Sequence, residues 1–143
     1  MQHLSLESDY GLRAVIYLSC RPKNEVSFVH DIAKDQLIPV PFLFKILRKL
    51  VRKGLVKSYR GPHGGYTLAR NPSQINFLEV IEAIDGPLVM NRCLDELTHC
   101  QLEPSCKMLN AWQRIQRHVT SELSSLTIAD LLQPVSPQKS AAS

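Results

Sequence analysis

Three cysteines lie in one short stretch of the chain, at Cys93, Cys100 and Cys106, with six and then five residues between them. A loop flanked by glycine and proline can bring three thiols to one centre without strain. Three thiolates leave a tetrahedral zinc ion or an iron–sulfur cluster one ligand short, so the fourth must come from elsewhere. Besides a residue of a second subunit, the candidates by chemistry are Asp9, Glu7, His99 and His118.

The spacing of these cysteines does not identify what they bind. It is not a zinc-finger spacing, although three cysteines and a histidine are a common structural zinc set. An iron–sulfur cluster, a structural zinc ion and three independent thiols therefore all remain open at this point. Cys20 stands apart, beside Ile16 and Tyr17, and is predicted to be a small buried apolar residue.

The composition indicates a globular cytoplasmic protein. A chain of 143 residues, 44% of them hydrophobic, is one domain with some length left for an oligomerisation element. No apolar run approaches the ~18 residues that would predict a membrane span, and the first residues do not resemble a signal peptide. We therefore expect a cytoplasmic protein with no membrane partner, in which clustered thiols stay reduced and bind metal or respond to redox state.

The positive charge is concentrated in one segment. Residues 36–78 contain no Asp or Glu but eight Lys and Arg side chains. Like charges repel one another in a folded segment, so this pattern favours a polyanionic partner over a merely solvated basic face.

Apolar periodicity predicts a mainly α-helical chain with one small β-hairpin. We expect Ser8 or Asp9 to cap the first helix, Ser27 to cap the second and Gly54 to end the third. The helices are expected at about residues 9–20, 28–36, 40–53, 77–85, 107–125 and 128–132, and the strands at 55–59 and 65–68. The predicted regions are a winged helix-turn-helix at 1–87, a cysteine-bearing loop at 88–106, a dimerisation helix and short terminal helix at 107–132, and a disordered tail at 133–143.

A helix, a sharp turn, a second helix with a basic outer face and a hairpin form the order of a winged helix-turn-helix. The helix at 40–53 would enter the major groove of double-stranded DNA, with its first residues at base edges and its basic residues on phosphates. The hairpin turn would bring Arg60 to the minor groove or to a phosphate. The alternative is a helical bundle whose hairpin only covers the core. The predicted DNA contacts are Pro39, Val40, Pro41, Phe44, Lys45, Arg48, Lys49, Arg60, Gly61, Pro62 and His63.

The helix at 107–125 has an apolar seam with steps of three and four residues, close to a heptad pattern. Such a seam predicts a homodimer that sets two winged helices on a near-palindromic site, although packing on the chain's own first helix is the alternative. Its members are Met108, Trp112, Ile115, Val119, Leu123 and Leu126. The sequence offers no nucleophile–base pair or phosphate-binding loop, so we do not expect an enzyme.

Several of these segments together resemble the IscR/NsrR/RirA family of winged-helix, iron–sulfur-cluster-sensing bacterial regulators. The resemblance runs from Leu4 to about Leu132 and is most specific at the hairpin, residues 60–69, with RGPHGGYTLA. The other matching segments are Leu4-Ser5, SDYGLRA at 8–14, Ile32-Ala33, Ile38-Pro39, Phe42-Leu43, Lys45-Ile46-Leu47, Gly54-Leu55-Val56, EVIEAIDGP at 79–87 and the three cysteines.

The resemblance implies a homodimeric transcriptional regulator, with a repressor favoured, whose DNA affinity depends on an iron–sulfur cluster ligated by Cys93, Cys100 and Cys106. Nitric oxide, redox state and iron status are the signals that such a cluster senses. RNA polymerase is a further candidate partner. A cluster-free winged-helix regulator with a zinc or thiol-sensing cysteine site is the alternative.

Departures from the family pattern bear on the fourth ligand. Cluster-assembly members place a His where this chain has Leu109, whereas nitric-oxide-sensing members place an Asp where this chain has Asp9. The resemblance therefore favours Asp9, supplied by the partner subunit, as the fourth ligand. It also favours a 4Fe–4S cluster, with 2Fe–2S still open. Without the resemblance, a role for Asp9 as the cap of the first helix is equally well supported. Leu37 stands where relatives often have Gly, and Phe44 where some have a polar base-reading side chain, so both bear on the operator sequence.

Overall fold

The computed structural model describes residues 4–133 of the chain. Its helices and strands follow the predicted order, and the mainly α-helical fold class with a small hairpin is confirmed. The α-helices are α1 Leu6–Ser19, α2 Val29–Gln36, α3 Val40–Arg52, α4 Phe77–Asp85, α5 Leu109–Ser125 and α6 Ile128–Leu131. The strands are β1 Val56–Tyr59 and β2 Gly65–Leu68, and the short 3-10 turns are η1 Pro72–Gln74, η2 Arg92–Leu94 and η3 Glu103–Ser105.

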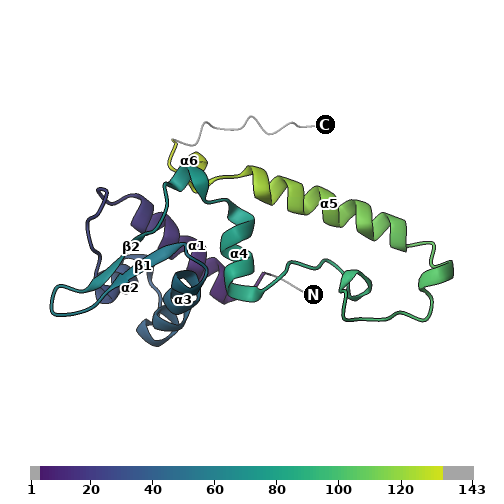
Figure 1. Cartoon of the computed structure of the whole chain (residues 1–143), viewed down its shortest axis with the longest axis horizontal. Helices are drawn as coiled ribbons and strands as arrows, with labels where there is room; N and C mark the ends of the chain where they lie inside the picture. The colour runs from purple at the N-terminus through teal and green to yellow at the C-terminus, as the bar shows by residue number, and fades with distance from the viewer. Residues whose placement is uncertain (1–3, 134–143) are drawn as a thin grey trace.

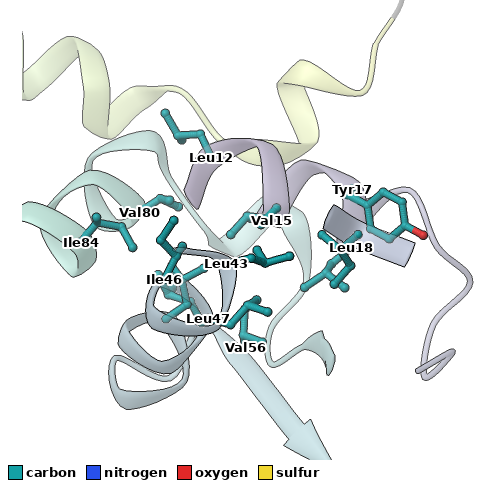
Figure 2. Packing of buried hydrophobic residues seen from close by; sticks show 14 of the residues in the cluster. Leu12, Val15, Tyr17, Leu18, Leu43, Ile46, Leu47, Val56, Val80 and Ile84 are labelled. Carbon is teal, nitrogen blue, oxygen red and sulfur yellow. The ribbon is translucent and has the colours of Figure 1, made fainter. Parts of the chain in front are cut away.

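The hydrophobic core lies between α1, α3 and α4 (Figure 2). α3 contributes a continuous stripe, Leu43, Ile46, Leu47 and Leu50, because these residues recur at three- and four-residue steps and so share one face of the helix. All four side chains are fully buried. This packing fixes which face of α3 is left for solvent or a partner.

The hairpin is antiparallel, with Val56 opposite Leu68 and Tyr59 opposite Gly65. Ser27 adds an isolated bridge on the other edge of β2, because its N–H and carbonyl both pair with the backbone of Tyr66 at 2.9 Å. The prediction that Ser27 caps α2 is therefore wrong: α2 begins after Phe28, which makes no side-chain cap bond, and the sheet pairing takes the place of the local cap.

The start and the end of α1 also differ from the prediction. Ser5 is the cap, since its Oγ accepts from the N–H of Ser8 at 3.0 Å, so neither Ser8 nor Asp9 caps the helix. Cys20 is exposed, and the prediction that it is buried is wrong. The physical reason is that α1 ends at Ser19, so Cys20 lies beyond the last helical turn that packs on the core.

The cysteine segment and α5 extend away from the body of the domain, on the side opposite the hairpin (Figure 1). The C-terminal end of α5 returns to the body, where the N–H of Ile128 bonds to the Ile75 carbonyl and the N–H of Phe77 to the Leu126 carbonyl, both at 2.8 Å. α5 begins at Leu109, two residues later than predicted. The predicted disordered tail lies, apart from Gln133, outside the described residues.

In the part of the chain that the structure describes, no helix is both long enough and apolar enough to cross a lipid bilayer.

Candidate functional site

The outward face of α3 carries the side chains that the sequence predicted for DNA. Opposite the buried stripe, five exposed residues follow one another at helical spacing, and we call them the outward stripe: Pro41, Phe44, Lys45, Arg48 and Arg52. The first turn of α3 has no acidic side chain and no side-chain cap. The partial positive charge of a helix N-terminus favours an anion such as a DNA phosphate.

Two of the predicted DNA contacts are held by an acidic side chain of α1. Lys45 Nζ lies 2.8 Å from Glu7 Oε1 and Lys49 Nζ lies 2.9 Å from Glu7 Oε2. Hydrogen bonds from Lys45 first, and from Lys49, hold the pKa of Glu7 below its usual value. Lys49 also donates to the Ile84 carbonyl at 3.1 Å, so this lysine joins α1, α3 and α4. Sequence reasoning missed these pairs because the partners are 38 and 42 residues apart.

The hairpin turn presents Arg60, Gly61, Pro62 and His63 to solvent, as the DNA-contact prediction requires. Gly61 has a φ of +100°, which an L side chain rarely adopts. A Cβ at Gly64 would collide with the Tyr59 carbonyl oxygen, so the turn can be this tight only with glycine there. Tyr59, half-exposed at the base of the turn, was not among the predicted contacts.

Asp9 lies on the exposed surface of α1, one turn before Arg13. Arg13 Nε and Nη2 contact Asp9 Oδ2 at 3.1 and 3.0 Å. Arg13 Nη1 donates to the Gln36 carbonyl at 2.7 Å. One guanidinium thus links the candidate fourth ligand to the last residue of α2, directly before the turn into α3.

That turn is strained at Leu37. Leu37 has a φ of +54°, in the left-handed region where glycine is favoured and an L side chain costs about 1 kcal/mol or more. Its exposed side chain does not contribute to the core. The Arg13 bond to the Gln36 carbonyl and the bond from the Ile38 N–H to the Ala33 carbonyl, at 3.0 Å, hold the backbone on either side of it.

Asp85, at the end of α4, fixes the start of α1. Its carboxylate accepts from Ser5 Oγ at 2.6 Å and from the buried Ser8 Oγ at 2.7 Å. Gly86, with a φ of +80°, then turns the chain towards the cysteine segment. The segment therefore begins directly beside the helix that bears Asp9.

The first residues of the cysteine segment are anchored to α5. Gln116 of α5 accepts from the Met90 N–H at 2.8 Å and donates to the Leu88 carbonyl at 2.7 Å. All four cysteines are free thiols, and the three in this segment are half-buried. Within residues 4–133, no group of three or more His, Cys, Asp or Glu side chains is close enough to hold a metal ion.

Two points follow for a metal or cluster at these cysteines. Three free thiols and an exposed carboxylate are donors that suit an iron–sulfur cluster, but the single chain does not hold them at one centre. Of the other candidate ligands, Glu7 is paired with two lysines, whereas His99 and His118 are exposed.

The apolar seam of α5 is only partly covered in the single chain: Leu123, near its C-terminal end, packs against the core. None of residues 109–125, all of which the structure describes, is fully buried, and Ile115 in the middle of the seam is 40% exposed. Figure 1 shows the N-terminal end of α5 projecting away from the body of the domain, which contains α1. The seam around Ile115 is therefore open to a partner, whereas its end at Leu123 packs on the chain's own core.

Comparison with known proteins agrees with this architecture. A family model described as Rrf2, iron-dependent transcriptional regulator, matches residues 4–134. The chain is 30% identical over 130 residues to the HTH-type transcriptional regulator NsrR of Shouchella clausii, covering 90% of this chain and 87% of that one.

Solved structures resemble the chain over most of its length. The structure of CymR, described as the global cysteine regulator of B. subtilis, superposes with a TM-score of 0.73 at 28% identity, covering 92% of this chain and 96% of that one. The IscR of T. potens gives a TM-score of 0.69 at 27% identity, with 92% and 86% covered.

Proposed function

The chain belongs to the Rrf2 family of transcriptional regulators, and from this membership we propose a homodimeric, DNA-binding repressor controlled by an iron–sulfur cluster. Cys93, Cys100 and Cys106 of one subunit and Asp9 of the partner subunit are the proposed ligands, with a 4Fe–4S cluster favoured over 2Fe–2S. The observation that carries the proposal is the link from Asp9 through Arg13 to the Gln36 carbonyl. It supports a direct path from a sensing site to the helix-turn-helix.

DNA binding is assigned to residues 1–87. The outward stripe of α3 is exposed and basic, the first turn of α3 contains no acidic residue, and the hairpin adds Arg60 at its turn. Together with the acid-free stretch at 36–78, this supports a helix in the major groove and a hairpin on the neighbouring minor groove or phosphate.

Dimerisation is assigned to residues 107–132, and the open seam of α5 supports it. Dimerisation also affects which residue can be the fourth ligand of the cluster. The cysteine segment, residues 88–106, extends outwards with α5, whereas α1, the helix that contains Asp9, lies in the body of the domain (Figure 1). A second subunit packed on α5 is therefore the suitable source of the fourth ligand.

Coupling would act through Asp9, whose oxygens contact Arg13 when they are not ligands. If Asp9 ligated iron, its carboxylate would donate electron density to the metal and its bonds to Arg13 would weaken. Arg13 also holds the Gln36 carbonyl beside the strained Leu37, and a change in Arg13 shifts the balance between two arrangements of the turn. The cluster supplies a centre that reacts with nitric oxide or oxygen or is lost when iron is scarce.

A second candidate is a cluster-free regulator whose cysteines bind zinc or respond as thiols. It is favoured by the separation of the candidate ligands within residues 4–133 and by the likeness to a global cysteine regulator. Both candidates share the DNA-binding fold and differ at the cysteine segment.

Anaerobic purification, followed by reconstitution with iron and sulfide, separates the two. The proposal predicts a brown protein with absorbance near roughly 400 nm that is lost in Cys100→Ser and kept in Cys20→Ser, a matched control at an exposed cysteine outside the segment. A colourless protein after reconstitution, with or without bound zinc, contradicts the cluster.

A further inference from the structure

We infer that Phe44 is the residue that reads sequence in the operator, and that it does so by contacting the C5-methyl group of a thymine in the major groove. The inference rests on the proposed DNA binding by α3 and names what that helix recognises.

Position on α3 is the first argument. Residues at the N-terminal end of a recognition helix reach base edges, and Phe44 lies in the first two turns of α3, on the outward stripe between Pro41 and Arg48. Phe44 belongs neither to the core cluster nor to the hydrophobic residues packed against it, and its side chain is 45% exposed.

Single exposed apolar side chains are common on protein surfaces, so exposure alone would mean little. The neighbours of Phe44 distinguish it from an ordinary exposed apolar residue. Lys45, the next polar residue of the outward stripe, is drawn to Glu7 on α1 at 2.8 Å. Arg48 lies one turn further from the N-terminal end, where basic residues contact phosphates or the outer base pairs.

Phe42 provides a contrast on the same helix. It is also exposed, at 51%, but it lies seven residues before Lys49 and therefore on the flank of α3 that faces Glu7 of α1. Of the two exposed phenylalanines of α3, only Phe44 is on the outward stripe.

The chemistry of the major groove then indicates which base Phe44 contacts. Each base pair presents hydrogen-bond donors and acceptors to the major groove, and the apolar group among them is the thymine methyl. A phenyl ring cannot satisfy a hydrogen-bond donor or acceptor. A ring at a base edge therefore strengthens binding when it buries the thymine methyl, and weakens binding when it removes water from a polar base edge without replacing the hydrogen bonds. The expected selectivity is for thymine at one position of each half-site.

The test replaces only the methyl group. The cluster-loaded, full-length protein selects a site from a pool of random duplex DNA, and each thymine in that site is then replaced by deoxyuridine, which pairs identically but has no methyl. We expect affinity to fall about fourfold at one thymine per half-site, the value of burying one carbon group. The Phe44→Ala protein should bind the thymine and uracil duplexes equally, and Phe42→Ala should still distinguish them.

Three other outcomes overturn the inference, and they point to different causes. If no duplex is selected at all, the proposed function fails with it. If a duplex is bound but uracil is tolerated at every position, DNA binding stands and methyl reading is wrong. If Phe44→Ala still distinguishes thymine from uracil, another residue reads the methyl.

Discussion

Arg13 and Gln36 are joined by a hydrogen bond of 2.7 Å, from Nη1 to the carbonyl oxygen, although 23 residues separate them. The same guanidinium binds Asp9 and lies over the ring of Tyr10, 4.9 Å from its centroid. A lysine could not hold both partners in this way, because it lacks the planar fork of donors. The bond connects the exposed surface of α1 to the turn that sets the direction of α3.

The first prediction concerns this bond. Arg13→Ala should lower affinity for the selected duplex about tenfold, since a hydrogen bond from a charged group contributes about 1.5 kcal/mol, and it should reduce the difference in affinity between cluster-loaded and cluster-free protein. Fluorescence anisotropy with both forms measures the two effects. Arg21→Ala is the matched control, because Arg21 is an exposed arginine stacked on Tyr17 at the other end of α1. Equal losses in both variants would mean that the bond to Gln36 has no special role.

The second prediction concerns Asp9 as a cluster ligand. Asp9→Ala should shorten the lifetime of the absorbance near roughly 400 nm while the protein remains dimeric in sedimentation, since a ligand is lost and the α5 seam is untouched. Arg13→Ala is the control here, because it breaks the same ion pair but keeps the carboxylate. If the two variants lose the cluster at the same rate, Asp9 acts through Arg13 and is not a ligand.

The third prediction concerns Glu7. Glu7→Gln should release Lys45 and Lys49 towards phosphates, raising affinity for random duplex DNA and steepening the dependence of log affinity on log salt by roughly 1 to 2 per subunit. Titration of labelled duplex at several salt concentrations measures the slope. An unchanged slope would show that neither lysine reaches DNA when it is released.

The pH dependence of the free energy of unfolding, compared between the wild type and Glu7→Gln, tests the ion pair itself. The pKa of Glu7 is lowered in the folded protein, so its contribution to the free energy of unfolding is fully present above the unfolded value of 4.5 and is lost as pH falls through the lower folded value. Because surface ion pairs contribute about 1 kcal/mol or less, the wild type should exceed Glu7→Gln by that amount near neutrality. The difference should vanish in strong acid, and a difference that persists there would exclude the ion pair as its cause.

The fourth prediction concerns the α5 seam. Ile115→Glu should convert the dimer to a monomer and abolish tight operator binding, because the interface would have to bury an unpaired carboxylate at a cost of several kcal/mol. Gln113→Glu introduces the same charge off the seam and should remain dimeric. Sedimentation velocity distinguishes the two, with circular dichroism to confirm helical content. A dimeric Ile115→Glu protein would move the interface elsewhere.

The sequence predicted the elements whose signal is local. The steps of three and four in α3 and α5 and the glycines of the hairpin turn predicted both helices and the hairpin, because these patterns depend on residues close in the chain. The comparisons confirm the family and the winged-helix fold, and the dimer and the cluster stay predictions.

Most of the errors and omissions come from contact between distant segments, whereas the exposure of Cys20 has a local cause, the end of α1 one residue earlier. Ser27 has the sequence of a cap, but pairing with Tyr66 decides its role. The bonds from Arg13 to Gln36 and from Glu7 to Lys45 join separate helices. Side-chain pairs across that much chain have no periodic pattern, so only the folded structure reveals them.

The central claim is that the cysteine segment controls DNA affinity through the winged helix. The most direct test measures the affinity of one protein preparation for one selected duplex before and after the cluster is removed anaerobically with a chelator, at fixed salt. We expect the cluster-loaded dimer to bind more tightly, about tenfold or more, and a Cys93→Ser, Cys100→Ser, Cys106→Ser protein to show no difference. Equal affinity of the loaded and stripped wild-type dimers would contradict it.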